Sequence, residues 1–343
     1  MKKLLLIVAL ILCFTGCDRR ERLHLFNWAY YTPESVVELF EKEFNVRVVI
    51  DEFTSNEEMF AKMMAGGGGG FDIIFPSEDY TAIMIQRDML LELDHSMLPN
   101  LRYLNPLVVN KMIFDPKLQF SVPYYMGTAG VLVNTLRVPE FERSWRIFER
   151  EDLRGRMTML DDMRETMGAA LHYLGYSANT TNHLEIEAAR VHIMERWRPN
   201  LLRFDAAAFG KIFANEDVWV VHGYPETVFF EVYDNKALFE ATYFFVPKEG
   251  GTAWIDSMVI PRTARNPELA HKFINFIHRP EIYAMFAEEF WFPTTLNPAA
   301  EEFRSGWTMY ETEDFINNEL KYDLGEALFL YHEAWFQSII IGR

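Results

Sequence analysis

Apolar positions along the chain follow two patterns in turn. Three short runs of continuous or alternating apolar residues predict β-strands, at residues 23–28, 46–53 and 71–77. Three stretches with an apolar residue at every third or fourth position predict helices, at residues 32–44, 55–65 and 80–87. Thr32 and Ser55 are expected to cap the first two helices, the second through a capping box with Glu58. Strands that alternate with helices predict an α/β fold with a parallel sheet.

The alternation starts again beyond residue 134, which predicts a second α/β lobe. Two extended segments with proline, near residues 122 and 246, are suited to cross between the lobes. Two crossings leave neither lobe continuous in the sequence. The predicted first lobe comprises residues 17–127 and 256–302, and the second comprises residues 128–255 and 303–343. We expect a cleft between them that closes by a hinge motion.

The segment FNWAYYTPESV places Trp28 and Tyr31 in the turn between the first predicted strand and the first predicted helix. Turns usually favour Gly, Asn, Asp and Ser instead. In α/β proteins such a corner lies at the carboxyl end of a strand, which is where ligands bind. The aromatic residues therefore indicate the wall of a pocket.

The chain has 343 residues, with 33 Lys and Arg against 50 Asp and Glu, and a net charge of −17. This length allows one large domain or two medium domains with real cores. The acidic balance argues against nucleic acid and anionic membrane surfaces as partners. It suits a cationic ligand, although it also serves solubility.

The first sixteen residues, MKKLLLIVALILCFTG, have the layout of a secretory signal: two lysines, an apolar stretch and small residues before Cys17. The order Thr15-Gly16-Cys17 predicts cleavage before Cys17 and a lipid anchor on it, with an ordinary cleaved signal as the alternative. No disulfide is expected, because the chain has only two cysteines and one lies in the leader. We expect an exported, lipid-anchored protein on the periplasmic side of a bacterial cell membrane.

Several stretches, in order, resemble the extracytoplasmic spermidine/putrescine-binding proteins that feed ABC importers. They run from about residue 23 to the C-terminus and include FNWAYYTPESVVELFEKEFNVRVV, FSVPYYMGTAGVLVN, DDMRETMGAALHYLGYSANTTN and VPKEGGTAWIDSMVIP. The most diagnostic runs from KEGG through Trp254, Asp256 and Ser257. The resemblance implies a two-lobed periplasmic-binding-protein fold of the class II type, with two crossover strands as the hinge and a polyamine in the cleft.

The resemblance also implies which residues contact the ligand. Trp28 and Trp254 match wall residues of the family, and Asp256 matches its principal anchor for an amine. His222 falls near a family tryptophan, and Phe292 replaces a tyrosine. The full set of ligand-binding candidates is Trp28, Tyr31, Ser77, Asp79, Asp162, Glu165, His222, Trp254, Asp256 and Phe292.

Some positions depart from the family pattern. Tyr30 stands where the family often has an acid, and Asp79 where it often has a tyrosine. Around His222 the alignment is open by a residue, with Tyr224 nearby, and Lys321 aligns near a glutamine. A cation at that place would be unwelcome if it pointed inward. These departures leave the preferred polyamine open.

The chemistry of these residues agrees with such a ligand. A polyamine is a methylene chain with ammonium groups at intervals, so its site needs aromatic walls and carboxylates. Asp162 and Glu165 lie three positions apart at a helix start, where the helix N-terminus favours their ionised forms. Trp254 and Asp256 lie two apart in a strand and share one face.

We therefore expect a monomeric receptor that binds a polyamine without cofactor or metal and docks to the permease and ATPase subunits of an ABC importer. A ferric-ion or other cation receptor on the same fold is an alternative, because paired tyrosines and His222 suit a hard metal. An enzyme is less expected, because the sequence has no Gly-x-Ser-x-Gly elbow and no His-Glu-x-x-His. Sensing through a membrane receptor, in place of delivery, stays open.

Overall fold

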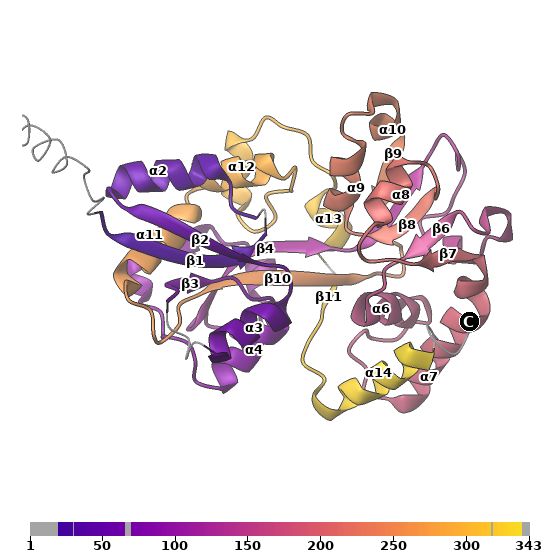
Figure 1. Cartoon of the computed structure of the whole chain (residues 1–343), viewed down its shortest axis with the longest axis horizontal. Helices are drawn as coiled ribbons and strands as arrows, with labels where there is room; N and C mark the ends of the chain where they lie inside the picture. The colour runs from indigo at the N-terminus through magenta and orange to yellow at the C-terminus, as the bar shows by residue number, and fades with distance from the viewer. Residues whose placement is uncertain (1–19, 30, 66–69, 317, 338–343) are drawn as a thin grey trace, which may run out of the picture.

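The structure is a computed structural model that describes residues 20–29, 31–65, 70–316 and 318–337. The predicted leader, its Cys17 anchor and Tyr30 lie outside the described residues. None of the helices within these ranges is both long and apolar enough to cross a bilayer. Figure 1 shows two lobes side by side, each built around its own sheet.

The first sheet has the strand order β11-β10-β3-β1-β2, and β4 pairs with the other edge of β10. Strands β1, β2 and β3 are parallel, whereas β10 runs antiparallel to both β3 and β4. The strands are β1 (Arg22–Trp28), β2 (Arg47–Phe53), β3 (Ile73–Ile74), β4 (Ser121–Thr128), β10 (Thr252–Val259) and β11 (Glu319–Leu320). The predicted parallel sheet of β1, β2 and β3 is thus present and is extended by β4, β10 and β11, of which β10 and β11 run in the opposite direction.

Helices cover both faces of this sheet because its strands bury side chains on both sides. Leu23 and Leu25 pack with one set of helices, and Phe26 packs with the other. The helices of this lobe are α2 (Glu34–Phe44), α3 (Asn56–Ala65), α4 (Glu78–Gln86), α5 (Pro106–Val109), α11 (Pro267–Ile277) and α12 (Pro280–Glu289). Ser55 accepts a hydrogen bond from the Glu58 N–H at 3.1 Å, as its capping position predicts. The Glu58 carboxylate accepts the Thr54 N–H at 2.9 Å, one residue before the N–H that a capping box would use.

The expected cap of α2 differs in the structure. Pro33 occupies the N-cap position, and no side chain caps the helix there. The Thr32 hydroxyl instead accepts a hydrogen bond from the Asn27 side chain at 2.8 Å. Thr32 therefore fixes the turn after β1 and does not cap the helix.

The second sheet has the order β7-β6-β8-β5-β9. Its strands are β5 (Gly130–Asn134), β6 (Met157–Met159), β7 (Leu201–Phe204), β8 (Val220–Gly223) and β9 (Thr242–Phe245). Around it lie α6 (Met163–Tyr173), α7 (His183–His192), α8 (Phe209–Ala214), α9 (Pro225–Val232), α10 (Lys236–Ala241) and α14 (Leu328–Phe336), with α13 (Thr312–Phe315) on the way to α14. Short helical segments occur in both lobes: η1 (His95–Met97), η2 (Pro99–Tyr103), η3 (Trp145–Glu149), η4 (Glu151–Leu153), η5 (Ile193–Trp197), η6 (Arg198–Asn200), η7 (Pro298–Phe303) and η8 (Gly325–Ala327).

The chain passes between the lobes at the two expected crossings, which lie side by side because β4 pairs with β10, and once more after η7. Strand β4 leads into β5 through Ala129, and β9 leads into β10 through residues 246–251. After η7 the chain returns to the second lobe, where α14 packs on α6 and α7. The expected division at 127/128 falls near the end of β4, and that at 255/256 falls inside β10. The assignment of residues to lobes stays a prediction.

One buried apolar cluster continues from the first lobe into the second. It includes Leu25 on β1, Tyr124 and Met126 on β4, and Phe213 and Val228 on helices of the second lobe. The opposite face of the second sheet has a separate core beneath α6 and α7. The crossing strands therefore pass through apolar packing, while the carboxyl ends of β1, β3 and β8 face the space between the lobes.

Candidate functional site

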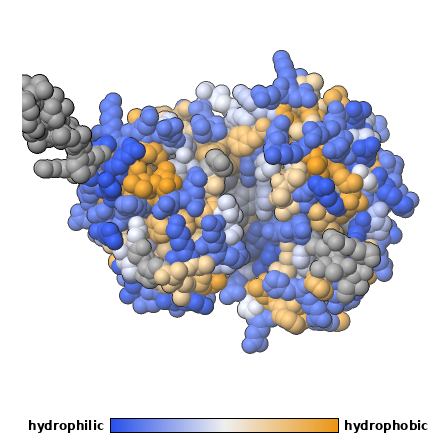
Figure 2. Space-filling view, viewed as in Figure 1, coloured by the Kyte–Doolittle hydropathy of each residue, from blue (hydrophilic) through white to orange (hydrophobic). Residues whose placement is uncertain are grey.

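A cavity of about 500 Å³ lies between the lobes. Figure 2 shows the groove in which it opens, with hydrophilic walls. Its lining consists of Trp28, Thr54, Ser55, Asn56, Glu57, Ser77, Glu78, Asp79, Tyr80, Asp162, Arg164, Tyr224, Glu226, Trp254, Asp256 and Lys321. Six of these residues are acidic and two are basic, so the cavity carries an excess of carboxyl groups.

Strand β10 presents Trp254 and Asp256 to this cavity, two positions apart as expected for one face of a strand. The indole of Trp254 lies over Gly127 of β4, its partner in the ladder. A Cβ atom at Gly127 would come within 2.4 Å of the Trp254 ring. The glycine therefore leaves the space that this aromatic wall occupies.

Asp256 is held from the other side by Ser77. The Ser77 hydroxyl donates to Asp256 Oδ1 at 2.7 Å, so it is not available to cap α4, although Ser77 is the N-cap residue. The Ser77 N–H donates to Asn56 Oδ1 at 3.2 Å, which fixes the turn before α4. Burial raises the pKa of Asp256 to about 7, while the Ser77 hydrogen bond opposes that rise.

The first turn of α4 brings two more carboxyl groups. Glu78 is buried and accepts the Ile255 N–H at 2.9 Å. Burial raises the pKa of Glu78 to about 8, against the opposing effect of the Lys321 charge. Burial also raises the pKa of Asp79. These acids are held where an uncharged form is favoured unless a cation lies near.

The second lobe closes the cavity with residues at the starts of two helices. Asp162 caps α6 and accepts the Glu165 N–H at 2.9 Å. Tyr224 stands edge-on to Trp254, with ring centroids 5.2 Å apart, so two aromatic walls from different lobes meet. Glu226, in the first turn of α9, has a buried Oε2 with no hydrogen-bond partner among the described residues, and burial raises its pKa to about 7.

A smaller cavity of about 260 Å³ adjoins the first and is mostly aromatic. It is lined by Trp28, Ala29, Tyr31, Glu226, Phe230, Trp254, Asp256, Phe290 and Phe292. Four residues, Trp28, Glu226, Trp254 and Asp256, line both cavities. The site thus has a charged part and an aromatic part that share one carboxylate-aromatic junction.

The ten candidates from the sequence fall into three groups. Six line the larger cavity: Trp28, Ser77, Asp79, Asp162, Trp254 and Asp256. Tyr31 and Phe292 line only the smaller cavity. Glu165 and His222 line neither.

Both residues outside the cavities have structural partners. Glu165 is buried, accepts a hydrogen bond from the Thr252 hydroxyl and forms an ion pair with Lys321. His222 lies within β8, where its ring packs edge-on against Trp145 with centroids 4.9 Å apart. Burial lowers the pKa of His222 to about 3, so it stays neutral. Tyr224, left open by the alignment, is the residue of this segment that lines the cavity.

Glu57, Glu78, Arg164 and Glu226 also line the cavity and were not among the candidates. Glu226 had a readable signal, since it is an acid at a strand-to-helix corner, one turn after β8. Glu78 lies between two residues that were chosen, at the start of a helix. Arg164 had no comparable signal in the sequence. Its guanidinium is held by the Tyr322 carbonyl and the Asn179 side chain, and these contacts exist only in the folded chain.

The geometry does not support a metal centre. Within the described ranges, no group of three or more His, Cys, Asp and Glu side chains is arranged to hold a metal ion. The hydroxyl of Tyr124 donates to the Tyr31 carbonyl at 2.7 Å, and that of Tyr125 is hydrogen-bonded to Tyr310. These tyrosines are therefore engaged in the core, and an organic cation suits the cavity better.

Comparisons with known proteins agree on one family. The family model described as bacterial extracellular solute-binding protein matches residues 35–312. The chain is similar to the spermidine/putrescine-binding periplasmic protein of Escherichia coli, with 33% identity over 98% of this chain and 96% of that relative. It is also similar to the putrescine/cadaverine-binding protein of Pseudomonas aeruginosa, with 34% identity over 81% and 80% of the two chains.

A solved structure gives the same result for the fold. The crystal structure of the TpPotD lipoprotein of Treponema pallidum matches 93% of this chain and 99% of that chain, with 42% identity and a TM-score of 0.89. The two-lobed arrangement expected from the sequence is therefore confirmed. The ferric-ion alternative finds no support among these relatives.

Proposed function

The chain belongs to the family of bacterial extracellular solute-binding proteins, which are not enzymes, and we propose that it captures a polyamine between its lobes and delivers it to an ABC importer. The names of its relatives, spermidine/putrescine-binding and putrescine/cadaverine-binding, support the ligand class. The observation that carries the proposal is the larger cavity, where six acidic residues face an aromatic wall made by Trp28, Tyr224 and Trp254.

Each part of a polyamine has a counterpart in this cavity. An ammonium group over an aromatic face gains roughly 0.5–2 kcal/mol, depending on how far it is desolvated. Charge-assisted hydrogen bonds to Asp256, Asp162 or Asp79 fix where each ammonium lies. The methylene chain between them packs on the rings of Trp28 and Trp254.

The acids of the cavity come from both lobes, which explains why a ligand would close the lobes around it. Asp256 belongs to a strand of the first sheet, whereas Asp162 and Glu226 begin helices that pack on the second sheet. A ligand with two positive ends gains its full set of contacts only when both lobes reach it. Ligand binding therefore favours the closed form, which is the form a transporter would recognise.

We further propose that residues 1–16 are a cleaved signal and that Cys17 carries a lipid anchor. The lipoprotein named among the structural neighbours supports this. The mature protein would act as a monomer tethered beside the permease and ATPase subunits of its importer. Delivery is proposed over sensing because the relatives in solved structures include substrate-binding proteins of ABC transporters.

Calorimetric titration tests the ligand. The chain from residue 18 retains every described element and lacks the lipid site. After unfolding and refolding to remove carried-over ligand, it is titrated with putrescine, spermidine and 1,4-butanediol, a neutral analogue of putrescine. Tight one-to-one binding of a polyamine with no heat from the diol supports the proposal. Absence of heat with both polyamines, from folded protein, overturns it.

A further inference from the structure

Lys321 brings a positive charge into a cavity whose chemistry is suited to positive ligands. It follows β11 and lines the larger cavity. Its ammonium forms an ion pair with Glu165, whose side chain is fully buried, and the lysine side chain itself is only 18% exposed. This lysine is therefore a fixed part of the cavity wall and not a solvated surface charge.

The ammonium of Lys321 stays charged in this place. Burial alone would lower its pKa, but the charges of Glu165, Glu78 and Asp162 outweigh burial and raise it. In turn, the Lys321 charge acts to lower the pKa of Glu78, Asp79 and Asp256. One lysine thus already supplies a positive charge to most of the acids in the cavity.

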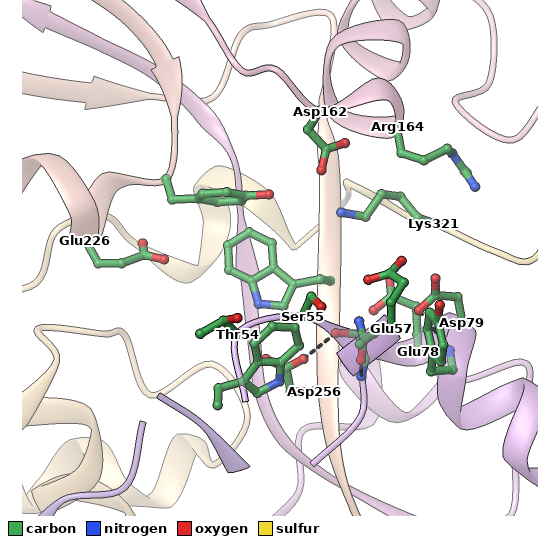
Figure 3. Close-up of a pocket in the computed structure, with 16 residues that line it drawn as sticks. Thr54, Ser55, Glu57, Glu78, Asp79, Asp162, Arg164, Glu226, Asp256 and Lys321 are labelled. Carbon is green, nitrogen blue, oxygen red and sulfur yellow. Dashed lines mark hydrogen bonds between the residues drawn. The ribbon is translucent and has the colours of Figure 1, made fainter. Parts of the chain in front are cut away.

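Figure 3 shows how these groups lie. The ammonium of Lys321 points toward the part of the cavity that Asp162 enters from the second lobe, with Glu57, Glu78 and Asp79 grouped on the side of the first lobe. Asp256 and Glu226 lie away from this group, beside the aromatic wall. The acids at the Lys321 end therefore lie beside its charge, and Asp256 feels the same charge from the junction of the two cavities. On Glu226 it is instead the Asp256 carboxylate that acts, and it raises the pKa of Glu226 further.

The other basic residue of the cavity, Arg164, acts on Asp79, whose pKa its charge helps to lower. Arg164 donates to the Tyr322 carbonyl at 3.0 Å and to Asn179 Oδ1 at 2.8 Å. Lys321 is committed to Glu165, and the terminal nitrogens of Arg164 are committed to the second lobe and the segment after β11. The unmet demand in the cavity is for positive charge near Asp256 and Glu226, where Oε2 of Glu226 has no partner within the described chain.

We propose that Lys321 acts as a built-in ammonium group that occupies one cation position of the site and makes this protein a receptor for diamines. The inference rests on the polyamine-binding function proposed above and names the substrate class within it. A diamine such as putrescine places its two ammonium groups on the acids that remain. A triamine such as spermidine must place its third ammonium beside Lys321 or displace it from Glu165.

Both options disfavour the triamine. Two ammonium groups side by side repel each other in a poorly solvated cavity, and like-charge contacts are a strong means of discrimination. Displacing Lys321 would leave it without the buried carboxylate that compensates its charge. We expect the wild-type protein to bind putrescine about tenfold or more tightly than spermidine.

The test compares the ratio of the two dissociation constants in the wild type and in Lys321→Gln, by calorimetric titration of the refolded chain from residue 18. Removing the lysine alone leaves buried Glu165 without its counter-charge, which risks misfolding. The double variant Lys321→Gln with Glu165→Gln removes both charges and keeps two groups that can hydrogen-bond. Lys248→Gln is the matched control, because Lys248 forms an ion pair with Glu142 on the surface, outside the cavity.

We expect both Lys321 variants to improve spermidine binding relative to putrescine by about tenfold, and Lys248→Gln to leave the ratio unchanged. A ratio that stays within twofold of the wild type in both folded Lys321 variants overturns it. So does a wild-type protein that binds spermidine as tightly as putrescine. In either case the polyamine function stands, whereas a wild type that binds neither amine overturns the function itself.

Discussion

The two lobes meet in two chemically different regions. One is the charged cavity, which Lys321, Glu78 and Asp162 line, with buried Glu165 paired to Lys321 behind its wall. The other is an aromatic clasp, which we define as Trp291 after α12, Phe230 and Tyr233 at the end of α9, Phe239 on α10, and Trp307. The clasp consists of aromatic rings, whereas the cavity holds several carboxyl groups whose pKa burial raises to about 7 or 8.

Because of this difference, we expect one region to determine ligand selectivity and the other to hold the two lobes together. Charged groups in a poorly solvated site discriminate strongly, because a missing or extra charge is costly there. Aromatic rings attract one another without reference to the ligand: Trp291 lies 4.9 Å from Phe230 and 5.3 Å from Tyr233, centroid to centroid. We infer that the cavity decides which ligand is bound and that the clasp adds ligand-independent affinity between the lobes. Substitutions in the cavity should therefore change the preference between ligands, whereas substitutions in the clasp should change the affinities for all ligands alike.

Asp256→Asn should have the largest effect. The change keeps the shape of the side chain and its contact with Ser77 but removes the charge that faces both cavities. Loss of one partner of a desolvated charge pair costs about 2–5 kcal/mol, so putrescine affinity should fall about a hundredfold. Calorimetric titration measures this directly.

The matched control is Asp51→Asn, since Asp51 also lies in a strand of the first sheet but is exposed. Its affinity for putrescine should stay within twofold of the wild type. An Asp256→Asn protein that binds as tightly as this control would remove Asp256 from the site.

Lowering the pH should have the next largest effect. Burial raises the pKa of Asp256 and of Glu226 to about 7, and an ammonium ligand favours their ionised forms. Binding therefore releases protons, and affinity falls as the pH drops through 7. For one such carboxyl the loss from pH 8 to pH 6 is about tenfold. Titrations in two buffers of different ionisation enthalpy would count the protons released.

The unliganded protein should show the opposite trend in stability. Between the ordinary pKa of an aspartate and the raised value of Asp256, the folded state keeps a proton that the unfolded state has lost. The free energy of unfolding therefore decreases as the pH rises through this window. Thermal melts at pH 5 and pH 8, with and without putrescine, test this trend in stability. A putrescine affinity that does not change between pH 6 and pH 8 would contradict the raised pKa of Asp256 and Glu226.

Gly127→Ala should disturb the aromatic wall of the cavity. The new Cβ atom would overlap the Trp254 ring at 2.4 Å, so the ring must move into the ligand's space. We expect a loss of putrescine affinity on the order of tenfold, from overpacking of about 1–3 kcal/mol. Gly306→Ala is the control, since a Cβ there would meet Glu288 at an ordinary 3.7 Å. Equal affinities of the two variants would mean that Trp254 is not a wall of the binding site.

The fold was readable from the sequence because it depends on local patterns. Short apolar runs predicted β1 and β2 close to their observed bounds, and apolar residues at every third or fourth position predicted α3. The capping position of Ser55 followed from its spacing to Glu58. The predicted cap at Thr32 was wrong, because Asn27 competes for its hydroxyl, which is a contact made by the folded turn.

The site was readable only in part, because burial and pairing are tertiary properties. Trp254 and Asp256 stand two apart in a strand, and this spacing predicts their shared face. Nothing in the spacing of Glu165 shows that Lys321, far along the chain, reaches it, and this ion pair takes Glu165 out of the lining. Glu226 gains its importance from a buried, unpartnered oxygen, which exists only once both lobes are in place.

Tyr233→Ala should cause the smallest loss of polyamine affinity, and its effect should contrast most clearly with that of substitution at Lys321. Tyr233 stacks on Trp291, is 60% exposed and lines neither cavity. An aromatic pair contributes about 0.5–1.5 kcal/mol beyond its buried area, so closure should weaken about threefold. Because Tyr233 itself lines neither cavity, putrescine and spermidine should lose affinity by the same factor. Tyr176→Ala, at an exposed tyrosine after α6, serves as the control.

The decisive observation is the ratio of the two dissociation constants, and not either value alone. Substitution at Lys321 is expected to change this ratio, whereas substitution at Tyr233 is expected to lower both affinities and leave the ratio intact. Pairs of uncharged rings are also insensitive to ionic strength, so the loss in Tyr233→Ala should be the same in low and high salt. If Tyr233→Ala altered the ratio, the clasp would take part in ligand selection, and the separation between the two regions would fail.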